Sequence, residues 1–279
     1  MKLFRLALAG FAALPLAPAP AETLEMTNNR LFLTVTVNGE RTMALLDSGA
    51  EMTILDDDFA ERLGLEAVGS ATAHGSGAET MRARFAENVA VEAAGVAFAT
   101  RVGILDLGEV SRRLLGRDVT MLLGRDLFDR ARLRIDILRG TIEIAGAAPP
   151  PGVRLPLSSH RGIPAIPASI EGEAPVQAVF DLGNGSGVMV GQAYAERIGL
   201  AAPERIVERR AGGGLGGARE RDIVVLRNLV VAGREYRDVR AAIDPGETAS
   251  DLNIGTSILR DFIITTDFAG GAIWLEPRP

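Results

Sequence analysis

The sequence predicts a mostly β protein of two similar halves, each a small β-barrel with one or two short helices. Two observations predict this fold class. Blocks of the first half recur in the same order in the second half, and such repetition indicates a duplicated unit. Apolar and β-branched residues flank turn dipeptides such as Asn38-Gly39, which is the pattern of β-hairpins.

The clearest repeat lies at the end of each half. Residues 122–144 align without gaps with residues 253–275, so that Gly124 meets Gly255. Apolar and polar residues alternate around a central Arg-Gly turn in the first copy, which predicts a hairpin. Because this block keeps its place in both halves, we expect two lobes of the same design.

A second repeat lies near the start of each half. Residues 45–65 resemble residues 179–200, with one residue inserted, and Asp47 meets Asp181. The part of this block at residues 56–65 predicts a short helix, since acidic residues suit the first turn and a glycine can close the last.

The N-terminus predicts an export signal. Lys2 and Arg5 give a short positive region, an apolar stretch follows, and small residues near Ala21 fit a cleavage site. Residues 1–21 are therefore expected to be a signal peptide, with a periplasmic or secreted location and no stable membrane span after its removal. The chain has no cysteine, so its cores are expected to form without disulfides.

The remainder divides into two lobes and a joint. Residues 22–147 are expected to form the N-terminal lobe and residues 158–279 the C-terminal lobe. The joining residues, 148–157, lie in a stretch that is rich in proline and glycine and has no periodicity. We expect a semi-extended linker there.

Asp47 raises a chemical question, because it ends a run of four apolar residues and a turn through Ser48 and Gly49 follows. Burying one carboxylate is costly. Two facing carboxylates can share a proton, since like charges about 3 Å apart cannot both ionise. One can then take a proton from water while the other donates to a peptide carbonyl. The duplication supplies Asp47 and Asp181 as the catalytic candidates.

The neighbouring residues suit such a pair. Ser48 can lock the turn through its hydroxyl, and Gly49 and Gly183 let the backbone approach each carboxylate closely. A glycine-rich stretch in each half is expected to be a mobile hairpin tip that closes over a substrate. The candidate residues of these tips are Gly75, Ser76, Gly77, Gly213 and Gly214.

With these motifs the chain resembles the retropepsin-like aspartic proteases. The resemblance rests on "LLDSGA" (45–50) and "LLGRD" (122–126), and it extends over residues 30–145 and 160–276. It implies an acid-protease fold in each lobe, endopeptidase activity on extended peptides, and one catalytic aspartate from each lobe. Neither a metal ion nor a cofactor is expected.

The second lobe has a degenerate motif. Leu182 replaces the hydroxyl residue that, in the family, links the two catalytic loops. The resemblance also implies an ion pair between Glu51 and Arg125 in the first lobe, whereas Gly185 and Thr256 stand at the matching positions of the second. Joint loss of both partners leaves no charge stranded.

Three interpretations stay open. Asp47 and Asp181 of one chain hydrolyse a peptide, for which a monomer suffices. Alternatively, two chains form a homodimer that joins Asp47 to Asp47. In the third, the chain is inactive and binds a peptide or protein in the old cleft. The partner is a peptide or protein in each case. A nucleic acid is not expected, because the formal charge is -6 and no basic stripe with aromatic residues occurs.

Overall fold

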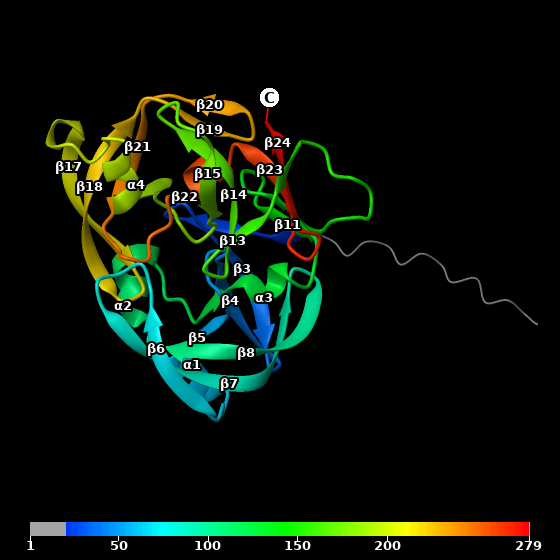
Figure 1. Cartoon of the computed structure of the whole chain (residues 1–279). Helices are drawn as coiled ribbons and strands as arrows, with labels where there is room; N and C mark the ends of the chain where they lie inside the picture. The colour runs from blue at the N-terminus through cyan, green and yellow to red at the C-terminus, as the bar shows by residue number, and fades with distance from the viewer. Residues whose placement is uncertain (1–20, 279) are drawn as a thin grey trace, which may run out of the picture.

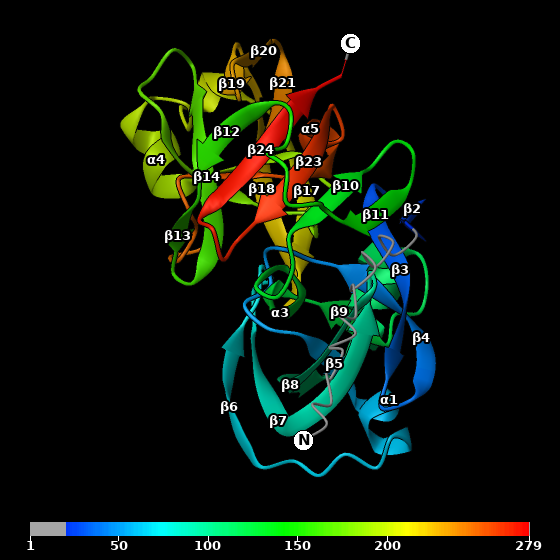
Figure 2. The same cartoon turned by 90° about the vertical axis from the view of Figure 1, so that its right-hand side faces the viewer.

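The computed structural model describes residues 21–278, which form three β-sheets with short helices between them (Figures 1 and 2). The expected mostly β fold with duplicated lobes is confirmed. The predicted signal peptide lies outside the described residues, apart from its last residue, Ala21. No helix among residues 21–278 is long and apolar enough to cross a membrane.

The first half is built on an eight-stranded sheet, in which β3 also pairs with β7. The Asn38-Gly39 turn joins β3 and β4 as expected, and both turn residues have a positive φ, 47° and 86°. The strands, in sheet order, are β2 (Glu25–Thr27), β3 (Arg30–Val37), β4 (Glu40–Leu46), β9 (Met121–Leu123), β5 (Ile54–Asp56), β8 (Val96–Leu105), β7 (Thr80–Ala93) and β6 (Gly69–His74).

The second half is built on a ten-stranded sheet, in which β13 pairs only with β14. Its strands are β17 (Ile206–Gly214), β18 (Gly217–Leu226), β21 (Val239–Asp244), β16 (Val188–Gly191), β22 (Leu252–Ile254), β15 (Val176–Phe180), β14 (Ile163–Ile170), β19 (Leu229–Val231), β20 (Arg234–Tyr236) and β13 (Ser158–His160).

Strand pairing repeats between the halves. In the first, β4 and β9 are parallel, β9 and β5 antiparallel, and β5 and β8 parallel. In the second, β15 and β22 are parallel, β22 and β16 antiparallel, and β16 and β21 parallel. The repeat in the sequence therefore corresponds to a repeated arrangement of strands.

A six-stranded sheet joins the halves, because β10 of the first pairs with β23 of the second. The segment expected to be a semi-extended linker, 148–157, contains the short strand β12, which pairs with β24. Backbone N–H and C=O groups of this segment thereby find partners in the sheet. The strands, in sheet order, are β1 (Glu22–Thr23), β11 (Thr141–Ile144), β10 (Leu133–Asp136), β23 (Phe262–Asp267), β24 (Ala272–Pro277) and β12 (Val153–Pro156).

The helices are short, as expected. The predicted helix at 56–65 is α1, where the Asp56 carboxylate caps the first turn by accepting the N–H of Asp58 at 3.1 Å. The helical segments are α1 (Asp57–Arg62), α2 (Gly108–Val110), the π-helical turn η1 (Ser111–Leu115), α3 (Arg125–Phe128), α4 (Gln192–Arg197), the 3-10 turn η2 (Pro203–Arg205) and α5 (Thr256–Leu259).

One apolar cluster runs through both halves and includes buried Phe59 and Phe180. Phe128 of the first half stacks on Phe268 of the second, with ring centroids 5.1 Å apart. Such a pair contributes about 0.5–1.5 kcal/mol beyond the area that it buries. The core and the shared sheet together fix how the two halves face each other.

Candidate active site

The two aspartates occupy equivalent places at the ends of two strands. Asp47 follows β4, and its N–H donates to the Leu123 carbonyl at 3.0 Å. Asp181 follows β15, and its N–H donates to the Ile254 carbonyl at 3.0 Å. Each aspartate therefore lies at the equivalent position beside the parallel neighbour of its strand, which is β9 in the first lobe and β22 in the second.

The fold brings Asp47 and Asp181 face to face. A Cβ added at Gly49 would lie 2.8 Å from Cγ of Asp181, and one added at Gly183 would lie 2.4 Å from Cγ of Asp47. A side chain at either glycine would therefore collide with the carboxylate of the opposite lobe. Each glycine N–H also donates to the carboxylate of its own lobe, Gly49 to Asp47 at 2.9 Å and Gly183 to Asp181 at 2.9 Å.

Ser48 links the turns that carry Asp47 and Asp181, although the second lobe has no matching hydroxyl. Its fully buried hydroxyl donates to the Phe180 carbonyl at 2.8 Å and accepts the N–H of Leu182 at 2.9 Å. Leu182 is itself fully buried and adds apolar contact instead. One serine thereby supplies two hydrogen bonds across the interface.

Burial and mutual repulsion perturb the carboxyl groups. Burial raises the pKa of Asp47, and the charge of Asp181 raises it further, to about 7, against hydrogen bonds from Gly49 and Ala50 and the charge of Arg30. Burial also raises the pKa of Asp181, against hydrogen bonds from Asn253, Asn184 and Gly183 and the charge of Arg30. A pair perturbed in this way can hold one proton near neutral pH.

Arg30, at the start of β3, is a component of the site that the sequence did not single out. Burial lowers its pKa, while attraction to Asp181 and Asp47 acts in the opposite direction. Its guanidinium donates to the Asn28 carbonyl at 3.1 Å, and a Cβ at Gly185 would lie 2.8 Å from Nη1. The sequence signal that could have identified it is a single cation at the start of an apolar strand.

The two glycine-rich tips, which were expected to close over a substrate, contact each other through backbone hydrogen bonds. The N–H of Gly77 donates to the Leu215 carbonyl at 2.9 Å, and the N–H of Glu79 donates to the Gly216 carbonyl at 2.8 Å. Cβ atoms at Gly75 and Gly214 would lie 2.2 Å from the Leu215 oxygen and 2.3 Å from the Ser76 hydroxyl, respectively. We call this contact between residues 75–79 and 212–217 the tip clasp.

Arginines hold the carbonyl groups of the clasp. Arg219 donates to the Gly77 carbonyl at 2.6 Å, and Arg221 donates to the Ser76 carbonyl at 2.9 Å. Arg113, from η1, donates to the carbonyls of Gly212 at 3.1 Å and Gly214 at 2.8 Å. Each guanidinium satisfies a polar group that a glycine-rich tip leaves open.

Leu215 anchors the clasp in the first half, and its removal tests the clasp. It packs against an apolar cluster that includes Phe32 and Leu122. Leu215→Ser is expected to speed amide hydrogen exchange at Gly77 and Glu79 roughly fivefold, because losing part of this burial costs about 1 kcal/mol of local opening energy. Exchange measured by mass spectrometry checks this.

Leu138→Ser is the matched control, since Leu138 is 57% exposed, and it should leave exchange at the tips unchanged. Equal exchange in the Leu215 variant and the parent would contradict an anchoring role for that side chain.

The ion pair expected between Glu51 and Arg125 is not formed, because no such pair within 4 Å occurs in the described residues. Arg125 pairs instead with Asp129, one helical turn later, at 2.9 Å. It also donates to the Gly162 carbonyl at 2.6 Å. The family motif drew attention to Glu51, whereas the acid one turn along α3 lies closer.

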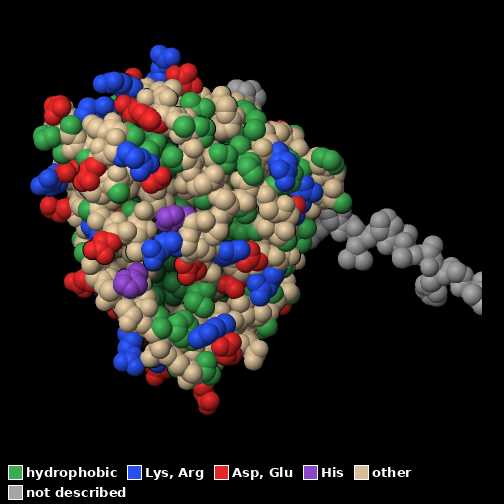
Figure 3. Space-filling model, viewed as in Figure 1, with side chains coloured by type: hydrophobic (Ala, Val, Ile, Leu, Met, Phe, Trp, Pro, Cys, Tyr) green, Lys and Arg blue, Asp and Glu red, His purple; other side chains and the backbone are tan. Residues whose placement is uncertain are grey.

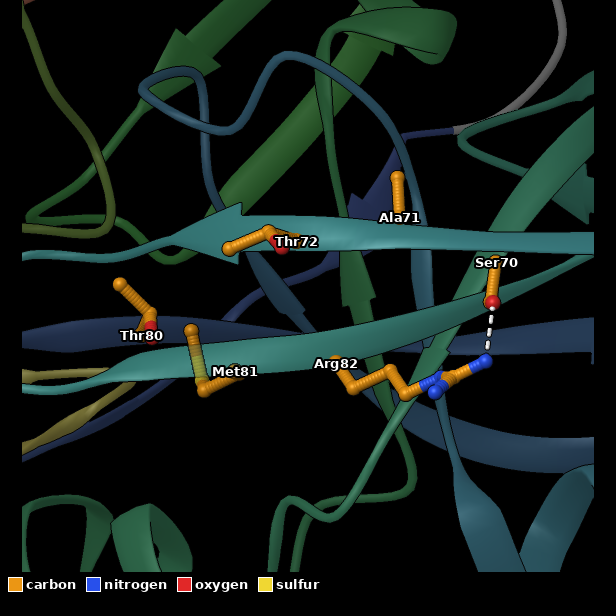
Figure 4. Close-up of a pocket in the computed structure, with 6 residues that line it drawn as sticks. All are labelled: Ser70, Ala71, Thr72, Thr80, Met81 and Arg82. Carbon is orange, nitrogen blue, oxygen red and sulfur yellow. Dashed lines mark hydrogen bonds between the residues drawn. The ribbon is translucent and has the colours of Figure 1, made fainter.

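An open hollow of about 460 Å³ lies along the β6–β7 hairpin, and neither aspartate lines it (Figure 4). Arg82 donates to the Ser70 hydroxyl there at 2.9 Å. The residues that line the hollow are Ser70, Ala71, Thr72, Thr80, Met81 and Arg82.

The face of the molecule in Figure 3 shows no concentration of one charge, and the described side chains form no metal site. Acidic and basic side chains are interspersed over that face. Among residues 21–278, no three His, Cys, Asp or Glu side chains gather as a metal site requires.

Several curated fungal proteins are similar to parts of this chain. UBA domain-containing protein Mud1 of Schizosaccharomyces pombe is 31% identical over 147 residues, which are 52% of this chain and 40% of Mud1. DNA damage-inducible protein 1 is 31% identical over 120 residues in Neurospora crassa and 29% identical over 170 residues in Chaetomium globosum. These matches take in 43% and 60% of this chain, and 26% and 34% of the relatives. The chain thus spans less than half the length of each relative.

These relatives contradict the prediction of a periplasmic or secreted location. They are fungal proteins named for a UBA domain or for induction by DNA damage, and neither name refers to export. The prediction rested on a short positive region, an apolar stretch and small residues. Such a brief pattern is weak evidence without a structural context.

Two further comparisons concern the family of this chain. A solved structure of a retropepsin-like aspartic protease from Rickettsia conorii is similar to part of it: the match covers 88% of that protease and 44% of this chain, with 17% identity and a TM-score of 0.36. The family model described as aspartyl protease matches residues 33–144 and 166–258, which include both aspartates. The chain therefore belongs to the aspartyl protease family, as its resemblance to the retropepsin-like enzymes predicted.

Proposed function

We propose that this protein is an aspartic endopeptidase that activates a water molecule between Asp47 and Asp181 of one chain. The observation that carries this proposal is the approach of the two carboxylates, each beside the glycine of the opposite lobe. The substrate is a peptide in an extended conformation, which must enter beneath the tip clasp, so the clasp has to open.

The reaction needs only the two carboxyl groups and water. The ionised carboxylate takes a proton from the water molecule while the water oxygen bonds to the peptide carbonyl carbon. At the same time the protonated carboxyl group donates its proton to the carbonyl oxygen. The resulting diol then breaks its C–N bond. The amine leaves with the proton taken from water, and the other carboxyl regains its proton. This is general acid–base catalysis with no covalent intermediate.

The geometry favours this proposal over a homodimer that pairs Asp47 with Asp47. Asp47 already faces Asp181, and the Ser48 hydroxyl fastens the two turns of the same chain together. A monomer therefore supplies both acids. A protein that only binds peptides would show binding without product, so measurement of cleavage separates that alternative.

The expected pH profile tests the proposal. Cleavage needs one proton on the pair, and the pKa of Asp47 is raised to about 7, so kcat/KM should fall as the pH rises through about 7 and the proton is lost. It should also fall in acid, where the second carboxylate becomes protonated. Mass spectrometry of products from a mixture of unfolded peptides, between pH 3 and 9 at roughly unit steps, checks this bell shape.

Absence of cleavage at every pH, with tight peptide binding retained, would overturn the proposal in favour of the binding protein. Cleavage that still rises above pH 8 would also contradict it, because no shared proton remains there.

A further inference from the structure

Asp181 receives a side-chain hydrogen bond that Asp47 lacks. One oxygen of Asp181 accepts the N–H groups of Gly183 at 2.9 Å and Asn184 at 3.0 Å. The other oxygen accepts the side-chain amide of Asn253 at 2.7 Å. A proton on either oxygen would therefore face a donor that is already in place.

Asp47 has a different environment. Its carboxylate accepts backbone N–H groups only, from Gly49 at 2.9 Å and from Ala50. No side chain among residues 21–278 donates a hydrogen bond to it. This carboxyl group can carry a proton without displacing a side-chain donor.

The orientation of the Asn253 amide is fixed by a chain of hydrogen bonds. The N–H of Ser186 donates to Oδ1 of Asn184 at 2.8 Å, and Nδ2 of Asn184 donates to Oδ1 of Asn253 at 2.7 Å. A backbone N–H can only donate, so Asn184 must turn its oxygen toward Ser186. Asn253 must consequently present its NH₂ group to Asp181, and a donor there favours the ionised carboxylate.

Both asparagines are specific to the second lobe. Asn184 stands three residues after Asp181, where the first lobe has Ala50 after Asp47. Asn253 in β22 pairs with the residue two before Asp181, and the first lobe has Leu122 at the same place in β9. Two apolar residues of one lobe thus correspond to two hydrogen-bonded amides in the other.

The charged groups at the site do not reverse this difference. Arg30 attracts both carboxylates, and its attraction to Asp181 is the stronger, so it acts in the same direction as the Asn253 amide. Burial raises both pKa values, and the charge of Asp181 also helps to raise the pKa of Asp47 to about 7. Among residues 21–278, the Asn253 amide is the side-chain hydrogen-bond donor that distinguishes Asp181 from Asp47.

We infer that Asn253 is a positioning residue that keeps Asp181 the ionised member of the pair and leaves the shared proton on Asp47. Resting on the proposed function, this assigns the chemical roles. Asp181 takes the proton from water, and Asp47 donates to the carbonyl oxygen. Asp181, the base, is thus the aspartate of the lobe with the degenerate motif, and the Asn253 amide stabilises its ionised form.

Titration of the carboxyl groups in the full chain tests the inference without requiring activity. Carbon NMR of protein labelled at the aspartate carboxyl groups, with the pair assigned from Asp47→Asn and Asp181→Asn variants, should show Asp47 as the group that titrates near pH 7. Asn253→Leu, which copies the first lobe, should raise the titration of Asp181 by roughly one to two pKa units, because one charge-assisted hydrogen bond is lost. In an active enzyme the acidic limb of kcat/KM should move up by the same amount.

Asn253→Ala removes the amide without adding bulk, and serves if the leucine variant does not fold. Asn228→Ala is the matched control, because within residues 21–278 its side-chain amide donates to Glu235 and to neither aspartate of the pair, and it should move neither titration. An unchanged Asp181 titration in both Asn253 variants, or a parent protein whose proton resides on Asp181, would overturn the inference. An inactive parent with the expected titrations would overturn only the proposed function.

Discussion

Replacing Asp47 by asparagine is expected to abolish peptide cleavage, with a fall in kcat/KM of at least about 10³-fold, because the shared proton loses its carrier. Peptide binding should persist, since an amide occupies nearly the same volume as a carboxyl group. Cleavage assayed at pH 4 to 8, alongside binding of an uncleaved peptide, measures both effects.

The same substitution should also stabilise the fold at neutral pH. The pKa of Asp47 in the folded state is about 7, above its ordinary value of 3.8. The folded state therefore binds more protons between these values, and its stability falls as the pH rises from about 4 to 7. Removing the ionisable group should raise the free energy of unfolding at pH 7 by roughly 1–4 kcal/mol, and should have no such effect below about pH 4.

Asp118→Asn is the control, because Asp118 is exposed and should affect neither activity nor stability. An Asp47→Asn enzyme that cleaves as fast as the parent would remove the catalytic role of Asp47. If Asp47→Asn gains less thermal stability over the parent at pH 7 than at pH 4, the raised pKa of Asp47 is contradicted.

Gly183→Ala is expected to have the second large effect. The added methyl group would lie 2.4 Å from Cγ of Asp47 and 2.5 Å from Oδ1, so the carboxyl group must move out of its place. A displacement of about 1 Å costs on the order of 10²-fold in rate, and kcat/KM should fall by at least that much. Circular dichroism should still show a folded β protein, because only one short side chain has to move.

Gly49→Ala should follow the same rule with a smaller effect, since its methyl group would lie 2.8 Å from Cγ of Asp181. Gly146→Ala is the control, because no heavy atom lies within 4 Å of an added Cβ there. Full activity in Gly183→Ala would mean that catalysis does not need the Asp47 carboxyl group at the position that it occupies beside Gly183.

The sequence predicted those parts of the fold that local rules and repetition determine. Asn38-Gly39 marks a hairpin through its own backbone preference, and the repeat of "LLDSGA" in a weaker form placed Asp181 opposite Asp47. Duplication implies a pseudo-twofold arrangement, so two equivalent positions near its axis can meet. The carboxylate pair followed from that symmetry alone.

The remaining features depend on contacts between segments far apart in the sequence. Asn253 and Arg30 reach the pair because β22 and β3 run beside it. No local pattern marks Asn253, and the position of Arg30 at the start of an apolar strand does not by itself show which groups it faces. Arg125 pairs with Asp129 because α3 brings them together, whereas the motif suggested Glu51. Each of these differences arises where the two halves have diverged, so a symmetric expectation could not anticipate it.

The shared six-stranded sheet has a consequence for how the molecule is made on the ribosome. β23 and β24 lie between β10 and β12, and they follow both Asp47 and Asp181 in the chain, so the ribosome makes them after both aspartates. Until these strands emerge, β10 lacks its neighbour and remains an open edge. A nascent polypeptide that stops short of β23 therefore lacks the strands that join its two halves, and its two acids are not yet held opposite each other by the shared sheet.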